Sequence, residues 1–327
     1  MPDKKTKVVD CHYHVISPNL AKKISAAAPV PELFKREQLV TEEEQLETAQ
    51  KSGVDALWFS FRTPPYYVGE KEILPSSPHC LTIARTANDY LASVCQRYPG
   101  RYMAFADIPL AHGDAAIIEM RRALNELDLN GICLQTNYEG KSLDAPEFRP
   151  FFEEANRLKA VIHLHPITPR ASEEALREYF MQVILGFPYE TTLTMVRLAY
   201  AGVLEQCPDL AFILSHAGGT IPYIWWRINM PYISNRPGSH EHIKAPATAT
   251  LARCYYDTAL SEADSLMLAY KRVGGDHILF GTDVPYGTKN ATERTMKEVE
   301  AMDVPKTVKN NIMSGNALAL SQRSRAK

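Results

Sequence analysis

The chain has 327 residues and a net charge of −2, from 36 basic and 38 acidic side chains. This length suits one large domain or two small ones, and so balanced a charge argues against nucleic acid or a membrane surface as a partner. No apolar run is long enough to span a membrane, and no apolar segment of a secretory signal follows the charged N-terminal residues.

The six cysteines are spread along the chain without a C-x-x-C pair. Several lie inside apolar runs, which is typical of reduced thiols in a protein core rather than of disulfides or a zinc ribbon. We therefore expect a cytoplasmic protein.

Eight short runs of apolar, β-branched and aromatic residues recur along the chain. They lack the polar alternation of a half-exposed strand, so both faces are expected to be buried, as in a parallel sheet covered by helices. The runs are residues 7–11, 54–61, 102–110, 131–136, 160–165, 210–216, 253–258 and 277–283.

Helical periodicity fills the segments between these runs. Apolar side chains recur at helical spacing in residues 42–52, 81–97, 114–127, 148–158, 191–206 and 260–273. Eight strands alternating with helices predict an α/β fold of the (β/α)₈ type, a TIM barrel. A doubly wound open sheet is the alternative, but such a sheet normally carries a glycine-rich turn after its first strand, where this chain has His12-Tyr13-His14.

Two connections are longer than the rest, residues 15–41 after the first strand and residues 167–190 after the fifth. In a barrel, both insertions would lie over the C-terminal mouth, where loops that cover a substrate are found. Since no internal repeat or low-complexity linker interrupts the chain, we expect one domain over residues 1–327.

The first strand ends in two histidines separated by one residue. Side chains alternate along a strand, so His12 and His14 are expected to point the same way and could share one divalent metal. A structural pair is the competing interpretation, which makes the ends of the other strands decisive.

Three other strand ends carry metal-ligand side chains. His163 and His165 end the fifth run, His216 ends the sixth and Asp283 ends the eighth. These ends converge at the mouth of a barrel. His163 lies between apolar residues and is better interpreted as a hydrogen-bonded core histidine, whereas His165 stands last, before a proline that ends the strand.

A donor set of three imidazoles and one carboxylate suits zinc, with manganese or iron as alternatives. A water or a substrate oxygen would take the remaining position of a catalytic site. His216 then serves as an acid–base group beside the metal. Each residue has a structural alternative as well: Asp283 could cap a helix, and His216 could open a tight turn.

Short motifs at these strand ends and near the C-terminus follow one another in a fixed order. They are Asp10-Cys11-His12-Tyr13-His14, His165-Pro166, His216-Ala217-Gly218-Gly219 with Pro222, Gly281-Thr282-Asp283-Val284-Pro285 and Gly315-Asn316-Ala317. Together they resemble the amidohydrolase superfamily, in the branch typified by aminocarboxymuconate-semialdehyde decarboxylase. The resemblance covers nearly the whole chain and implies an amidohydrolase-like barrel.

The resemblance also implies roles for single residues. Metal ligation would fall to His12, His14, His165 and Asp283, with His216 as the catalytic histidine. Binuclear members of the superfamily carry a carbamylated lysine on the fourth strand, which here ends in Leu134-Gln135-Thr136-Asn137, so we expect one metal.

Two arginine positions of that decarboxylase bear on the substrate. One lies eleven residues after the catalytic histidine, reaches the partner subunit's active site and corresponds to Arg227, which implies a homodimer. The other lies in the helix before the second strand, and residues 42–47 of this chain contain no arginine. The chain therefore departs here from the aminocarboxymuconate enzyme.

Candidate substrate contacts are Arg62, Tyr189, Tyr223 and Arg227. Arg62 follows the second strand, where a guanidinium could hold a carboxylate, and a surface ion pair is an equally good interpretation.

We predict a metal-dependent, non-oxidative decarboxylase of a small hydroxylated aromatic or unsaturated carboxylic acid. Asp283 or His216 would protonate the carbon that bears the carboxylate. A metal-dependent hydrolase of a lactone, ester or amide on the same site is the alternative. A non-catalytic metal-binding protein is a third interpretation, which the complete set of site residues disfavours.

Overall fold

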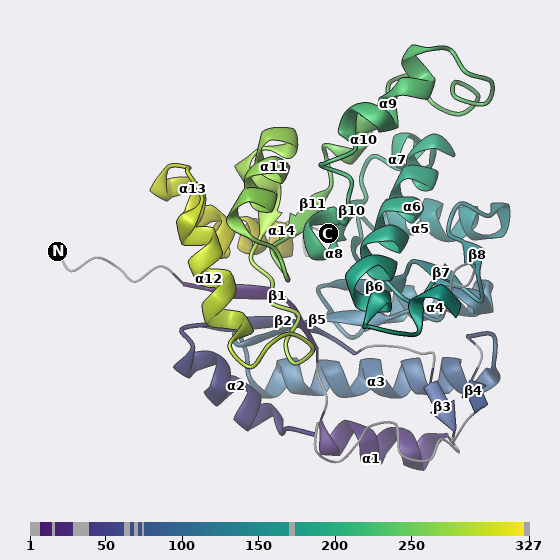
Figure 1. Cartoon of the computed structure of the whole chain (residues 1–327). Coiled ribbons are helices and arrows are strands. Elements are labelled where there is room, and N and C mark those ends of the chain that lie inside the picture. The colour runs from purple at the N-terminus through teal and green to yellow at the C-terminus, as the bar shows by residue number, and fades with distance from the viewer. Residues whose placement is uncertain are drawn as a thin grey trace.

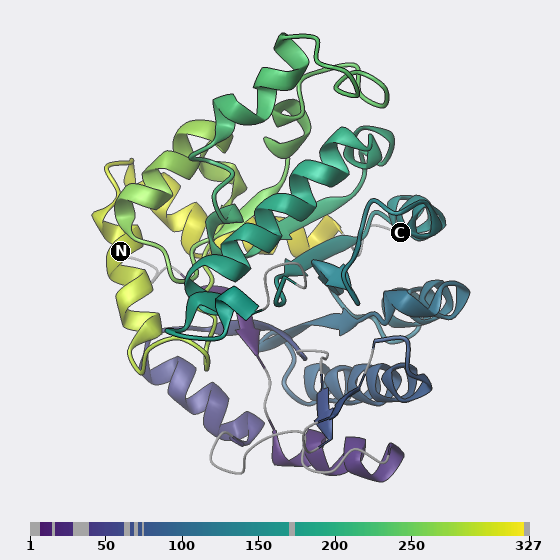
Figure 2. The same cartoon turned by 45° about the vertical axis from the view of Figure 1, so that its right-hand side comes forward.

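Eight parallel strands follow one another round the molecule in chain order, with helices on their outer side (Figures 1 and 2). The computed structural model describes residues 7–14, 17–28, 39–61, 66–68, 71–73, 75–169 and 174–323. The strands are β1 (Val9–His14), β2 (Ala56–Ser60), β5 (Tyr102–Asp107), β6 (Gly131–Gln135), β9 (Val161–His165), β10 (Ala211–Leu214), β11 (Tyr255–Asp257) and β12 (Ile278–Leu279). Each lies within or overlaps one of the eight predicted runs.

Hydrogen bonds between β1 and the segment after β12 bring the two edges of the sheet together. Cys11 N–H donates to the Phe280 carbonyl at 2.9 Å, Asp283 N–H to the His12 carbonyl at 2.7 Å and His14 N–H to the Val284 carbonyl at 2.8 Å. The prediction of a (β/α)₈ barrel is confirmed.

The described helices connect and cover the strands, and a few begin at a capping residue. They are α1 (Pro18–Ala27), α2 (Glu42–Lys51), α3 (Pro78–Arg97), α4 (Asp114–Asn125), α5 (Arg149–Arg157), α6 (Phe187–Tyr200), α7 (Val203–Gln206), α8 (Ser215–Gly218), α9 (Trp225–Ile233), α10 (Thr248–Leu251), α11 (Ala263–Val273), α12 (Ala291–Ala301), α13 (Lys306–Asn310) and α14 (Asn316–Arg323). For example, Thr41 and Glu44 form a reciprocal capping box at the start of α2.

The prediction of one continuous helix over residues 191–206 was wrong. Residues 191–206 form the end of α6 and the separate α7, because Gly202 has a φ of +74° and its Cα lies against the His242 carbonyl. A Cβ at residue 202 would approach that oxygen to 2.4 Å, so only glycine fits there.

Both long connections contain short elements in their described parts. The first includes α1, whose N-cap Ser17 accepts hydrogen bonds from the first turn. The second includes the turns η5 (Glu174–Leu176) and η6 (Gln182–Gly186), which lead directly into α6. Two hairpins that the sequence did not reveal, β3–β4 (Tyr66–Val68 and Lys71–Ile73) and β7–β8 (Asn137–Tyr138 and Lys141–Ser142), also lie between barrel elements.

The barrel interior is a packed apolar core and not a channel. Trp58 and Phe105 stack at its centre with ring centroids 4.6 Å apart, and Ala317 and Leu320 of α14 belong to the same cluster. A larger cluster fills the layer between the strands and the surrounding helices. The interior is therefore filled below the mouth, which leaves the C-terminal strand ends to form a site.

Among the described helices, none combines the length and the apolarity needed to cross a lipid bilayer.

Candidate metal centre and active site

Four side chains that lie far apart in the chain converge at the C-terminal mouth of the barrel. His12 and His14 come from β1, His165 ends β9 and Asp283 follows β12. Each offers one ligand atom, these atoms all lie within 4.8 Å of one another, and all four residues are buried. The structure thus brings together the four residues that the sequence singled out as metal ligands.

A β-bulge turns the two histidines of β1 into the mouth. Val9 lies opposite Ala56 and His14 opposite Ser60, so five steps along β1 match four along β2. Such an extra residue shifts the pleat by one position and changes which side chains face inward. Val9 and Cys11 therefore pack into the apolar interior, while His12 and His14 point into the site above them, with ring centroids 5.2 Å apart.

The hydrogen bonds on the outer side of the histidine rings leave lone pairs for a metal. His12 Nδ1 lies 2.6 Å from Asp257 Oδ2, and His165 Nδ1 lies 3.0 Å from the Pro166 carbonyl. Both partners only accept, so each Nδ1 carries a hydrogen, and each Nε2 is left to bind a metal or a second proton. The buried Nε2 of His12 makes no hydrogen bond within the described residues, although it lies 3.3 Å from Asp283 Oδ1. This donor set fits one divalent cation.

The electrostatics of the site favour positive charge. Burial would raise the pKa of Asp283, but His12, His14 and His216 hold it well below its usual value. Burial would likewise lower the pKa of His12, yet Asp257 and Asp283 raise it to about 10. A proton on His12 or a divalent cation can each satisfy these carboxylates, so the two compete for the site.

Asp257, at the end of β11, is a site residue that the sequence analysis missed. One of its oxygens accepts the hydrogen of His12 Nδ1, and the other accepts the backbone N–H of His216 at 2.8 Å. It therefore orients His12, a candidate metal ligand, and the backbone of His216 together. The available signal was a carboxylate that closes a predicted strand, the same feature that singled out Asp283.

Asp257→Asn is expected to weaken metal binding by roughly 10- to 100-fold, because loss of the carboxylate makes the His12 imidazole a poorer ligand. Calorimetric titration of the metal-free protein with zinc or manganese measures the change. Asp264→Asn on the exposed surface of α11 is the control and is expected to bind metal like the unaltered protein. Equal affinities for the two variants would contradict a role for Asp257 in orienting His12.

His216 lies just beyond β10, in α8, with its Nε2 3.3 Å from Asp283 Oδ2. Its backbone is left-handed, with φ 56° and ψ 53°, which is costly for a residue with a side chain and must be held by its surroundings. The glycines after it serve packing: a Cβ on Gly218 would meet the Tyr256 ring at 2.4 Å, and one on Gly219 the Pro188 carbonyl at 2.3 Å.

His163 lies below the centre, as expected of a core histidine. Its Nε2 is 3.1 Å from Ser215 Oγ, and its ring centroid is 4.7 Å from that of His12. Burial lowers its pKa well below the ordinary value, so the ring is neutral.

None of the predicted substrate contacts that the structure describes, Tyr189, Tyr223 and Arg227, belongs to the candidate metal cluster. Arg62 lies outside the described residues, and Tyr189, Tyr223 and Arg227 are exposed. Two aromatic rings that were not among the predicted contacts lie beside histidines of the site. Phe187 stacks over His216 with centroids 6.5 Å apart, and Tyr286 lies 5.1 Å from the His14 ring.

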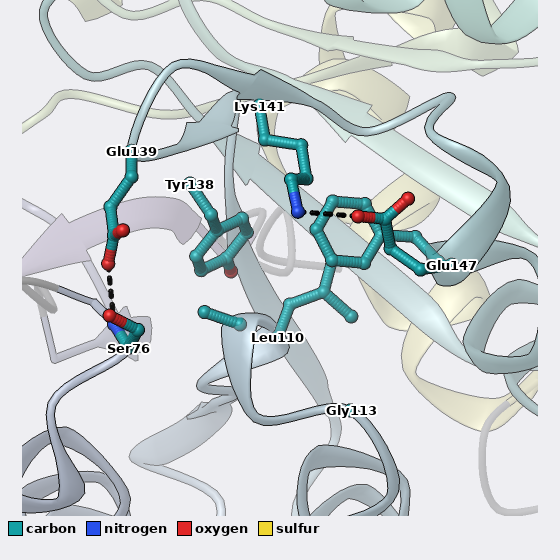
Figure 3. A pocket seen from close by; sticks show the side chains of 9 residues that line it. Ser76, Leu110, Gly113, Tyr138, Glu139, Lys141 and Glu147 are labelled. Atoms are coloured by element: carbon teal, nitrogen blue, oxygen red, sulfur yellow. Dashed lines mark hydrogen bonds and ion pairs between the residues drawn. The ribbon is translucent and has the colours of Figure 1, made fainter.

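A separate cavity of about 420 Å³ opens beside the β7–β8 hairpin (Figure 3). Leu110, Tyr138 and Phe148 form its apolar walls, and the Lys141–Glu147 ion pair, 2.5 Å long, lies at its edge. None of the four metal-site residues lines this cavity. We therefore place the chemistry at the barrel mouth and not here.

Comparison with known proteins assigns the chain to a family. Residues 9–320 match the family model described as amidohydrolase, and the chain belongs to this family.

Two curated relatives are decarboxylases. The chain is 27% identical over 246 residues to the 2-amino-3-carboxymuconate-6-semialdehyde decarboxylase of Dictyostelium discoideum, covering 73% of this chain and 66% of that protein. It is 30% identical over 257 residues to the 6-methylsalicylic acid decarboxylase of Penicillium expansum, covering 77% and 78%.

Among solved structures, the chain resembles the dihydroxybenzoic acid decarboxylase of Polaromonas sp. JS666. The TM-score is 0.82 at 22% identity, and the match covers 98% of both chains. That structure contains manganese and the inhibitor 2-nitroresorcinol. At this identity the likeness confirms the barrel fold.

Proposed function

We propose that this protein is a metal-dependent decarboxylase that removes CO₂, without oxidation, from a small hydroxylated aromatic or unsaturated carboxylic acid. The observation that carries the proposal is the cluster of His12, His14, His165 and Asp283, with His216 in contact with Asp283. The curated relatives support this proposal, because their names describe decarboxylases of aromatic or unsaturated acids.

His12, His14, His165 and Asp283 would hold one divalent cation, and we propose zinc. The manganese in the Polaromonas structure makes that metal the main competitor. When bound, the cation would supply positive charge that orients an anionic substrate and stabilises negative charge as it develops.

The residues around the centre are arranged to move one proton. Asp283 Oδ2 and His216 Nε2 lie 3.3 Å apart, so a proton held by either can pass to a substrate carbon placed above them. Protonation of the carbon that bears the carboxylate interrupts the conjugation of the ring. Breaking the bond from that carbon to the carboxylate then releases CO₂, and the bonding electrons restore the conjugation. Phe187, packed against His216, supplies an apolar wall for a flat substrate.

Release of CO₂ from a panel of hydroxybenzoates tests the proposal. Protein reconstituted with zinc, manganese or iron is expected to convert at least one member, and His216→Ala is expected to lose that activity. Bound metal with no CO₂ release, together with cleavage of a lactone or ester, would replace the decarboxylase by the hydrolase.

We further propose that the protein is a homodimer in which Arg227 binds the substrate carboxylate in the partner's site. The support is the exposed apolar surface of α9, where Tyr223 just before the helix is 80% exposed, Trp226 68% and Ile233 55%. Helix α9 projects beyond the ring of helices that surrounds the barrel (Figures 1 and 2). A surface of this kind is typical of a protein–protein interface. Tyr189 and Arg62 are retained as candidate contacts.

Trp226→Glu is expected to convert the dimer to a monomer, because a charge replaces an aromatic anchor at the interface. Light scattering measures the mass, and KM is expected to rise roughly tenfold or more as Arg227 leaves the partner's site. Ile118→Glu on α4 is the control, since Ile118 is 58% exposed on a different helix, and this variant is expected to stay dimeric. A monomeric unaltered protein would contradict the proposal.

A cytoplasmic location is also part of the proposal. All six cysteines lie in described residues, and none of them forms a disulfide.

A further inference from the structure

Asp107, the last residue of β5, is a buried acid on the inner wall of the barrel that the mechanism above does not use. Two residues before it on the same strand, Phe105 packs in the barrel interior against Trp58. Its partner on the neighbouring strand is Cys133, which also belongs to the interior cluster. Both the alternation of side chains along β5 and its pairing with β6 therefore place the Asp107 carboxyl on the inner face of the barrel. Asp107 lies at the C-terminal end of the strand, where the site lies.

Hydrogen bonds hold the backbone of Asp107, while one oxygen of its side chain lacks a partner. Asn88 of α3 accepts from the Asp107 backbone N–H at 2.7 Å and donates to its carbonyl at 3.0 Å, which secures the end of the strand. The residue is 2% exposed, and its Oδ2 is buried without a hydrogen bond in the described part of the chain. Buried polar atoms without a partner are uncommon and destabilise the folded protein unless another group satisfies them.

The surroundings of Asp107 favour its neutral, protonated form. Burial raises its pKa well above the ordinary value, and nearby Glu119 adds to the shift. Glu119 itself is ion-paired with Arg122 at 2.8 Å, so this negative charge is fixed beside Asp107. A neutral carboxylic acid can donate one hydrogen bond and accept others, which is the pattern that a hydroxyl or an amine complements.

Asp107 lies at a distance from the metal centre that one aromatic ring can span. The sheet register runs from Asp107 through Cys133 to His163, whose ring contacts His12. Two strand spacings separate Asp107 from His163, or about 10 Å between backbones, and the side chains shorten this gap. A ring that binds at the candidate metal centre through its carboxylate is therefore long enough for its opposite edge to reach Asp107.

We propose that Asp107 is a specificity residue whose carboxyl group hydrogen-bonds a hydroxyl or amino substituent on the edge of the substrate ring opposite the reacting carboxylate. This inference rests on the proposed function. A substrate with hydrogen or methyl at that edge leaves a buried acid unpaired, and a site built to form a hydrogen bond discriminates strongly against such an analogue.

The test compares matched substrates on the metal-loaded protein. For the unaltered protein, kcat/KM is expected to be at least tenfold higher for the better of 2,4- and 2,5-dihydroxybenzoate than for its methyl analogue, 4- or 5-methylsalicylate. For Asp107→Ala, kcat/KM for the dihydroxy acid and for its methyl analogue are expected to differ by no more than about threefold. This change is expected to come mainly from a lower kcat/KM for the dihydroxy acid. Asp107→Asn, which keeps a donor and an acceptor, is expected to retain part of the preference.

Glu42→Gln is the matched control, because Glu42 is an equally buried acid that lies in α2, outside the barrel. It is expected to leave the substrate ratio unchanged. Thermal unfolding establishes that each variant is folded. The proposal is overturned if the unaltered protein shows no preference for the hydroxyl group, or if folded Asp107→Ala keeps the full preference.

A binding measurement separates this inference from the proposed function. Calorimetry with 4-nitroresorcinol, nitrohydroquinone and 2-nitrophenol, nitro analogues of 2,4-dihydroxybenzoate, 2,5-dihydroxybenzoate and salicylate, requires no turnover. If no acid is decarboxylated but a dihydroxy analogue binds at least tenfold more tightly than 2-nitrophenol, and Asp107→Ala removes the difference, the proposed function fails and Asp107 keeps its role. Equal binding of the three analogues to the unaltered protein overturns the role of Asp107.

Discussion

Asp283→Asn is expected to lower kcat by roughly 10³-fold or more. The Asp283 carboxylate lies 3.0 Å from His14 Nε2 and 3.3 Å from both His12 Nε2 and His216 Nε2. Asparagine keeps the shape of the side chain but removes the charge that all three imidazoles face. Both metal binding and proton transfer are expected to weaken, because the Asp283 carboxylate takes part in each.

Steady-state rates on the best hydroxybenzoate, together with elemental analysis for bound metal, measure this effect. If metal content is retained while kcat falls, the main loss lies in proton transfer; if both fall together, ligation dominates. Asp303→Asn, an exposed aspartate in the C-terminal part of the chain, is the control and is expected to change kcat less than twofold. A rate for Asp283→Asn within tenfold of the unaltered protein would remove Asp283 from the chemistry.

Removal of the metal is expected to abolish turnover and to lower the thermal midpoint by several degrees. A ligand present at about 100 times its dissociation constant stabilises the folded state by roughly 2.7 kcal/mol, and this stabilisation disappears with the metal. Without the cation, the negative charges of Asp257 and Asp283 are left uncompensated, and a proton on His12 then balances them. Dialysis against a chelator, followed by rate and unfolding measurements, tests both effects.

Re-addition of zinc, manganese or iron should restore activity, and the metal that restores most at equal occupancy is the competent one. The double variant His14→Ala/His165→Ala is the control, since a chelator should leave its thermal midpoint unchanged once two ligands are missing. Full activity in a preparation with less than about one metal per ten chains would contradict a metal-dependent mechanism.

Most of the architecture could be predicted from local patterns. The eight strands lie at the apolar runs, because a stretch without polar alternation is stable only where both of its faces are covered. The candidate ligands could be selected for a related reason: ligand-type side chains at the ends of parallel strands must meet at one mouth. His12, His14, His165 and Asp283 meet there in the structure.

Details that depend on contacts between distant segments could not be predicted in this way. Asp257 gains its role only because β11 lies where its carboxylate can reach both His12 and the backbone of His216. The break between α6 and α7 depends on the approach of His242 to Gly202.

The class of fold, the order of the strands and the four clustered side chains could be predicted from the amino-acid sequence, because they follow from periodicity and from ligand-type residues at strand ends. The direction in which these side chains point depends on how the strands pair in the folded protein. The bulge in β1 that turns His12 and His14 inward appears only when β1 is paired with β2. The left-handed backbone of His216 likewise needs Asp257, since a strained local conformation persists only where long-range contacts stabilise it.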